Sequence, residues 1–125
     1  MAIEFDVVVP DRPGELGRLA RTLAEKGVNI HAIAACTGDG KGYVNMLLPE
    51  GRTTREVLRS AGYEYVERTV VTVTLKDKPG TLGDLAKRLA EAGVNVTSVI
   101  TLATGGGRVQ LAIGVDNLEK ARRVV

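Results

Sequence analysis

The residues best suited to bind a charged small molecule occur in two copies along this 125-residue chain. Asp11 opens the segment DRPGELGRLARTLAEKGVNI and Asp77 opens DKPGTLGDLAKRLAEAGVNV; thirteen of the twenty positions are identical. In each copy a Pro-Gly pair leads into a helix pattern, so free backbone N–H groups are expected at a helix N-terminus. In the first copy these belong to Gly14, Glu15 and Leu16. Such N–H groups suit a carboxylate, and the aspartate can accept hydrogen bonds from an ammonium group.

An asparagine follows the helix pattern in both copies, as Asn29 and Asn95, and its amide can both donate and accept hydrogen bonds. Each of these side chains also has a purely structural interpretation. Asp11 and Asp77 are typical of helix N-caps, and the asparagines are typical of the turn after a helix. The turn glycines are expected because a Cβ would block close approach to the backbone.

Other residue types that do chemistry are scarce. His31 is the sole histidine and Cys36 the sole cysteine, so neither an intramolecular disulfide nor a Cys/His metal cluster is available. The glycine-rich segments 38–42 and 105–107 lack the Lys-Ser/Thr of a phosphate-binding loop and are expected to be hairpin turns. No nucleophile and base form a convergent set. We therefore expect no cofactor, no metal site and no enzymatic activity.

Both copies show the same order of predicted elements, β-α-β-β-α. Alternating apolar residues predict strands at 3–9 and 71–75, and apolar residues at helical spacing predict the helices that follow. Gly27 and Gly93 are expected to end these helices in the left-handed conformation. Hairpin strands are predicted at 28–36 and 43–48, then at 94–103 and 108–115, and second helices at 54–61 and 118–125.

A fourth strand, at 63–67, completes the first copy. The order β-α-β-β-α-β is that of the ferredoxin-like sandwich, an α+β fold with an antiparallel sheet and both helices on one face. The sequence therefore predicts two tandem units, residues 1–67 and 68–125, of which the second lacks its last strand.

The composition and the sequence patterns argue against nucleic acid and membranes as partners. The formal charge is +2, which is too small to attract nucleic acid or an anionic membrane. RNA-recognition motifs share the predicted order of elements, but Phe5 alternates with the buried residues and Tyr43 lacks the Gly/Ala-Phe that should follow it. No apolar stretch approaches 18 residues, and the N-terminus does not resemble a signal peptide. We expect a cytoplasmic protein that binds neither nucleic acid nor membrane.

The repeated pattern DRPGxLxxLAxxLAxxGVNI resembles the ACT domain, the small-molecule-sensing module of amino-acid metabolism. Residues 9–30 are especially similar to the regulatory part of aspartokinases. The resemblance implies a free amino acid bound between two modules, beside the turn and the start of the second strand, and places Asp11, Asn29, Asp77 and Asn95 on ligand-binding positions. With the turn residues, the predicted ligand-binding set is Asp11, Arg12, Gly14, Glu15, Leu16 and Asn29, and Asp77, Lys78, Gly80, Thr81, Leu82 and Asn95.

The sequence departs from a related site. The serine site of bacterial phosphoglycerate dehydrogenases, which the motif also resembles, has asparagine at the position of Asp11 and histidine two residues earlier. Val9 and Leu75 occupy the histidine position in this chain. The resemblance therefore does not imply serine, and it leaves lysine or threonine open as the effector.

The function implied is that of a stand-alone regulatory sensor, which binds an amino acid and modulates a separate metabolic enzyme or regulator allosterically. Apolar residues expected on the uncovered sheet faces favour burial in an interface, and so predict a homodimer. They are Val8, Ile33, Leu47 and Val99. The alternative is a ligand-independent interaction module or regulatory subunit that only contacts other proteins.

Overall fold

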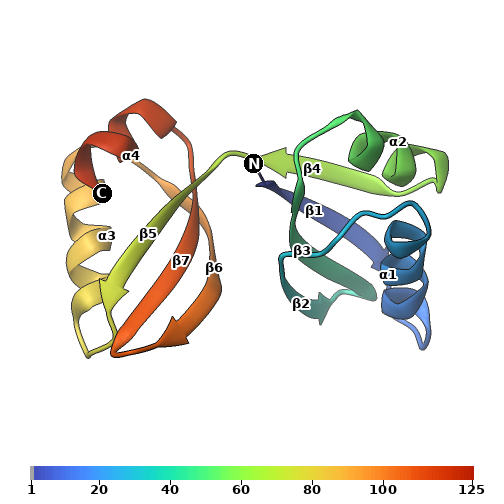
Figure 1. The fold of residues 1–125 in the computed structure, drawn as a ribbon, viewed down its shortest axis with the longest axis horizontal. Coiled ribbons are helices and arrows are strands. Elements are labelled where there is room, and N and C mark those ends of the chain that lie inside the picture. The colour runs from blue at the N-terminus through green and yellow to red at the C-terminus, as the bar shows by residue number, and fades with distance from the viewer. Residues whose placement is uncertain (1) are drawn as a thin grey trace. The chain divides into compact units, whose positions relative to one another are not determined.

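The computed structural model describes residues 2–125, which form two compact units with the boundary between Arg68 and Thr69. Unit 1 has an antiparallel sheet in the order β2-β3-β1-β4, with both helices on one face (Figure 1). Its elements are β1 (Ala2–Pro10), α1 (Glu15–Glu25), β2 (Ala32–Gly38), β3 (Lys41–Pro49), α2 (Arg52–Ser60) and β4 (Glu64–Arg68). This is the predicted ferredoxin-like order.

Unit 2 repeats the arrangement with one strand fewer. Its three antiparallel strands lie in the order β5-β7-β6, again with both helices on one face (Figure 1). Its elements are β5 (Val70–Lys76), α3 (Thr81–Glu91), β6 (Val96–Gly105), β7 (Arg108–Val115) and α4 (Leu118–Val124). Within the described residues, no strand pairs with β5 on the side where β4 pairs with β1. The predicted fold class, with a second unit that lacks its last strand, is confirmed.

Alternation along the strands places one row of side chains beneath the helices of each unit. In β1 the inward row includes Phe5 and Val7, which are fully buried together with Leu19 and Leu23 of α1. These two leucines are four residues apart and therefore lie on one face of the helix. Full burial of a side chain of this size contributes on the order of 1.5–3 kcal/mol. Phe5 lies in the core, as the alternation predicted.

The second strand of each unit begins later than predicted. Gly27 has a φ of 72°, and the next residue, Val28, donates its N–H to the carbonyl of Leu23 at 3.0 Å. These contacts end the helix with a left-handed glycine, as predicted, but they also tie Val28 to α1. The chain therefore enters β2 only at Ala32. Unit 2 repeats this at Gly93, and β6 begins at Val96.

Ile33 and Val99 do not lie on the uncovered sheet faces, and that prediction is wrong. Ile33 is paired with Met46 and Val99 with Ile113, and directly paired residues share a face of the sheet. Met46 and Ile113 are buried in the two cores, so all four face the helices. Ile33 and Val99 are nevertheless 45% and 44% exposed, because β2 and β6 are edge strands that the helices do not fully cover.

A polar cluster joins three strands on the other face of the unit 1 sheet. Asp6 of β1 accepts a hydrogen bond from Asn45 of β3 at 2.6 Å and another from Nε of Arg68 of β4. The Arg68 guanidinium also lies 3.7 Å from Glu4. Burial raises the pKa of Asp6, but hydrogen bonds with Glu4, Asn45 and Arg68 outweigh it, so the net pKa lies below the ordinary value of 3.8.

Acid should weaken unit 1 through this cluster. A carboxylate with a lowered pKa contributes stability above its unfolded value, and that stability is lost as the pH falls through the folded value. We expect the unfolding free energy to decline as the pH falls below about 4, and Asp6→Asn to be less stable at pH 7 but less sensitive to acid. Urea unfolding at pH 7, 4 and 3 measures both effects. Equal acid sensitivity of the two proteins would contradict the assignment.

The turn glycines are required by their backbone conformation. Gly14 and Gly80 precede α1 and α3 with φ values of 90° and 96°, and no atom lies within 4 Å of a Cβ built on either. Gly14→Ala or Gly80→Ala should therefore cost about 1–2 kcal/mol of unfolding free energy. Gly17→Ala, inside α1 and equally open, is the matched control and should stabilise by roughly 0.5–1 kcal/mol. Equal effects in urea unfolding would exclude the backbone explanation.

Candidate functional site

The turn between the first strand and the first helix has the same hydrogen bonds in both units. The N–H of Asp11 donates to the carbonyl of Gly40 at 3.2 Å, and that of Asp77 donates to Gly107 at 2.9 Å. These bonds attach each turn to the glycine-rich hairpin between the unit's next two strands. The N–H of the fourth helical residue, Arg18 or Asp84, donates to the glycine carbonyl at 2.9 Å in both units. The duplication is therefore preserved in the backbone.

Asp11 and Asp77 are not helix N-caps. The N-cap residues are Gly14 and Gly80, and neither helix start has a side-chain cap. Both aspartates are exposed, so their carboxylates face solvent beside the turn. Of the N–H groups expected to be free, that of Glu15 donates to the carbonyl of Arg12 at 3.4 Å.

Unit 1 has a cavity of about 180 Å³ beside this turn, between the start of α1 and the end of β2. This volume is below the roughly 300–1,000 Å³ typical of drug-sized ligands, and it suits a smaller molecule. Four predicted residues line it: Asp11, Arg12, Glu15 and Leu16. Sequence reasoning missed the remainder of the lining, which comes from the end of β1 and from the hairpin: Val9, Pro10, Ala35, Cys36, Thr37, Gly42 and Val44.

The charged groups of this cavity are organised around Glu15. Its side chain is only 10% exposed, and one carboxylate oxygen, Oε1, accepts a hydrogen bond from Nε of Arg12 at 2.9 Å. The other oxygen, Oε2, lies 3.9 Å from Nη1 of Arg18. The Arg18 guanidinium lies over the ring of Tyr63, 5.3 Å from its centroid. The buried carboxylate of Glu15 thus lies beside two arginines, of which Arg12 lines the cavity.

Unit 2 has different side chains on the same turn. Lys78 and Thr81 occupy the positions of Arg12 and Glu15, and the Thr81 hydroxyl donates to the carbonyl of Lys76 at 2.7 Å. A second cavity, of about 160 Å³, lies between α3 and β6. Its lining is entirely apolar: Leu82, Leu85, Ala86, Leu89, Val96, Val99 and Ile113. Of the predicted residues of this unit, only Leu82 lines it.

Asn29 and Asn95 do not lie beside the turns of their own units. Pro10, just before the turn of unit 1, is paired with Lys41 at the start of β3. His31, two residues after Asn29, donates its N–H to the carbonyl of Leu47, near the other end of β3. Lys41 and Leu47 are six strand residues apart, or about 20 Å at ~3.3 Å per residue. Asn29 is therefore at the opposite end of unit 1 from Asp11. Asn95 is placed equivalently, and its N–H donates to Asp116 at 2.9 Å.

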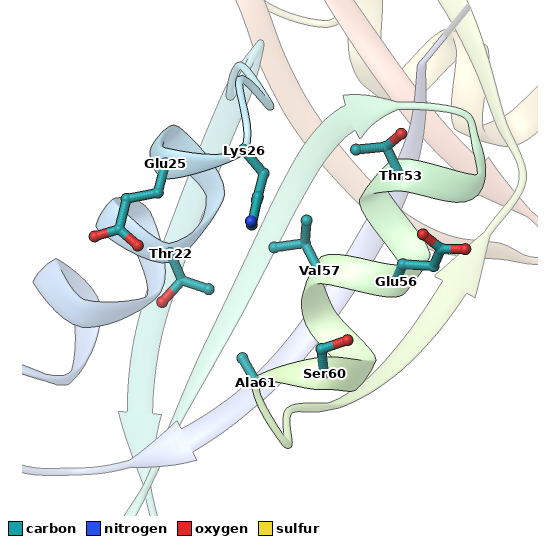
Figure 2. Close-up of a pocket in the computed structure, with 8 residues that line it drawn as sticks. All are labelled: Thr22, Glu25, Lys26, Thr53, Glu56, Val57, Ser60 and Ala61. Carbon is teal, nitrogen blue, oxygen red and sulfur yellow. The ribbon is translucent and has the colours of Figure 1, made fainter.

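A larger open groove, of about 490 Å³, lies between α1 and α2 of unit 1 (Figure 2). Lys26 extends into the space between the helices, and Val57 points towards it from α2, whereas Glu25 points away (Figure 2). No predicted residue lines this groove: its lining is Thr22, Glu25, Lys26, Thr53, Glu56, Val57, Ser60 and Ala61. Among the described residues, none of this lining has a buried polar side-chain atom without a hydrogen-bond partner. By contrast, Oε2 of Glu15, beside the turn, is buried without a hydrogen-bond partner among the described residues.

Other chemistry finds little support in the described part of the chain. His31 and Cys36 are both exposed. Within residues 2–125 no three His, Cys, Asp or Glu side chains are grouped so as to hold a metal ion. In the same range, no helix combines the length and apolar character needed to cross a bilayer.

Three solved structures share this fold over nearly the whole chain. A protein from Bacteroides thetaiotaomicron aligns over 98% of this chain and 85% of its own, with a TM-score of 0.83 and 17% identity. The ligand-free regulatory subunit of aspartate kinase from Thermus thermophilus aligns over 98% of this chain and 89% of its own, with a TM-score of 0.73 and 19% identity. A structure of aspartokinase alpha and beta subunits aligns over 98% of this chain and 88% of its own, with a TM-score of 0.71 and 22% identity. No curated protein sequence matches the chain.

The family model for the ACT domain matches the chain twice, at residues 3–61 and 69–121. The two matches fall within the two structural units and together span most of the chain. They agree with the repeated turn, the paired hairpins and the helix-covered sheets described above. The chain belongs to the ACT domain family, as a tandem pair of its modules.

Proposed function

We propose that this chain is a regulatory protein that binds a free amino acid beside the turn of unit 1 and modulates a separate enzyme or regulator. The observation that carries the proposal is the cavity's pairing of carboxylates with guanidinium groups beside a helix N-terminus. An amino acid at neutral pH carries both an ammonium and a carboxylate. Asp11 and Glu15 suit the ammonium group, whereas Arg12 and the helix start suit the carboxylate.

The structural neighbours add support for a regulatory role. The Thermus thermophilus protein is a regulatory subunit of aspartate kinase, and it has this fold over nearly the same length. By analogy with that subunit, this chain acts on a separate enzyme.

A thermal-shift screen tests amino-acid binding directly. Each of the twenty amino acids is added at millimolar concentration to the purified chain. At a hundred times its dissociation constant, a ligand stabilises the folded state by about 2.7 kcal/mol, which raises the melting temperature of a domain of this size by several degrees. A shift with one amino acid or a related group is expected. If none of the twenty shifts the melting temperature, amino-acid sensing is excluded and the interaction-module alternative takes its place.

We further propose that the chain forms a homodimer through the edges where α1 meets β2 and α3 meets β6. Each edge exposes an equivalent apolar pair beside an edge strand: Leu16 with Ile33, and Leu82 with Val99, each between 44% and 48% exposed. Pairing of edge strands would cover these side chains. Leu16 also lines the turn cavity, so a partner at this edge would enclose the bound amino acid and link binding to assembly.

Light scattering after size exclusion tests this assembly. The double variant Ile33→Lys and Val99→Lys should change a dimer into a monomer, because two lysines cannot be buried between edges without partners. The control is Val66→Lys, on β4 at the opposite edge of the unit 1 sheet from β2, where the side chain is 57% exposed. A dimer that survives the double variant but is lost in the control would place the contact elsewhere.

A further inference from the structure

The two units differ most at one edge of their sheets. In unit 1, β4 pairs with residues 4–8 of β1 and covers the outer edge of that strand. In unit 2, β5 is the counterpart of β1 and lies at the edge of its sheet (Figure 1). Within the described residues no strand pairs with β5 on its outer side. The backbone N–H and C=O groups along this side are therefore available to an extended segment.

The core of unit 2 shows what a further strand would cover. Val7 and Val9 of β1 face the helices of unit 1 and are 0% and 5% exposed. Their counterparts on β5, Val73 and Leu75, face the helices of unit 2 but are only partly buried. In unit 1, Tyr65 of β4 lies opposite Val7 and packs against the core. A large apolar side chain opposite Val73 would complete the same row in unit 2.

An arginine beside this edge differs in its pairing between the units. Arg55 of α2 donates two hydrogen bonds to the carboxylate of Glu67 on β4, both at 2.8 Å. Arg122 of α4 is its counterpart, because each arginine directly follows a residue buried beneath its helix, Thr54 in unit 1 and Ala121 in unit 2. Arg122 is exposed, and among the described residues it has no ion pair. A carboxylate on an added strand would give it the partner that Arg55 has.

The other face of the sheet makes a different demand. In unit 1, Asp6 of β1 accepts a hydrogen bond from Arg68 of β4. The counterpart of Asp6 on β5 is Thr72, which has no charge to pair with a cation. A strand that fits β5 therefore needs the aromatic residue and the acid of β4, but it does not need the arginine.

The strand itself has few features that prevent pairing. From Val70 to Leu75 it contains no charged residue and no proline, which are common protections of an exposed edge. It also pairs with β7 residue by residue over its whole length, whereas β6, at the other edge of this sheet, has two register shifts. A regular strand of this kind suits the addition of a neighbour.

We propose that β5 is the docking edge for an extended acidic segment of a partner protein, which adds a fourth strand to unit 2 antiparallel to β5. The segment places an aromatic side chain opposite Val73. Two residues later it places a carboxylate opposite Val71, the counterpart of Phe5, where Glu67 lies in unit 1 and where Arg122 can pair with it. The proposal goes beyond the proposed function, because strand addition to unit 2 requires no amino acid in unit 1.

Fluorescence anisotropy with the full chain and a labelled peptide tests the proposal. The probe has the sequence of residues 63–69, YEYVERT, which carries the required aromatic residue and acid. One control peptide has the Glu67→Lys change and another has Tyr65→Ala. The protein variants are Arg122→Glu and, as the matched control with the same change of charge, Arg123→Glu on the next position of α4. Circular dichroism and a cooperative melt establish that both variants are folded.

We expect saturable binding of the probe, and a loss of about five- to twentyfold in affinity for Arg122→Glu, because an ion pair is replaced by two like charges. Arg123→Glu should bind as the wild type does. The Tyr65→Ala peptide should bind more weakly to every protein. The Glu67→Lys peptide should bind poorly to the wild type and regain affinity for Arg122→Glu. Hydrogen exchange should show slower exchange in β5 and no change in β1 when the probe is bound.

Several results would overturn the proposal. Equal losses in Arg122→Glu and Arg123→Glu would reduce the interaction to general attraction by the basic helix. Protection in β1 instead of β5 would mean that the probe displaces β4 in unit 1. Absence of binding, or a lysine peptide that does not recover with Arg122→Glu, would remove the assigned register. None of these results bears on amino-acid binding, which the thermal-shift screen measures separately.

Discussion

In each unit, one backbone hydrogen bond joins the turn before the first helix to the hairpin between the next two strands. The N–H of Asp11, or of Asp77 in unit 2, donates to a carbonyl in the hairpin turn between the unit's next two strands. This bond brings together the end of the first strand, the start of the first helix and the glycine-rich hairpin, three segments that the sequence separates. The cavity of unit 1 exists because these segments meet. Main-chain atoms supply the constraint, so the side chains of the turn are free to differ between the copies.

The duplication has preserved geometry and changed chemistry. Corresponding turn hydrogen bonds agree within a few tenths of an ångström, and the φ angles of Gly14 and Gly80 are nearly equal. Within this common frame, unit 1 has a buried carboxylate bonded to an arginine, whereas unit 2 has a hydroxyl bonded to main-chain carbonyls. In unit 1 the charge of Glu15 is paired with arginines, whereas in unit 2 the Thr81 hydroxyl is satisfied by the main chain.

Local patterns in the sequence were sufficient for most of the fold. The alternation in β1, the helical spacing of Leu19 and Leu23 and the left-handed Gly27 each act within a few residues, and the structure follows them. Features that depend on strand pairing could not be predicted in this way. A strand that begins at Val28 places Ile33 on the uncovered face, and only the pairing with Met46 shows that it faces the helices. Within the candidate site, the sequence identifies the turn residues. The resemblance groups Asn29 with them, but the length of α1 separates Asn29 from the turn.

The pairing of β4 with β1 has a consequence for synthesis of the chain. Glu4 is opposite Arg68, so the edge of the unit 1 sheet is formed by the two ends of the unit, and the side chains of Asp6 and Arg68 join across it. A ribosome must therefore deliver nearly the whole of unit 1 before its last strand can dock, whereas the β2–β3 hairpin can form as soon as it emerges. Until then, one side of β1 lies open, and its exposed backbone is available to any extended segment nearby. In unit 2 no strand covers the corresponding side of β5 within the described residues, so the edge that is open only transiently in unit 1 stays open in unit 2 after synthesis.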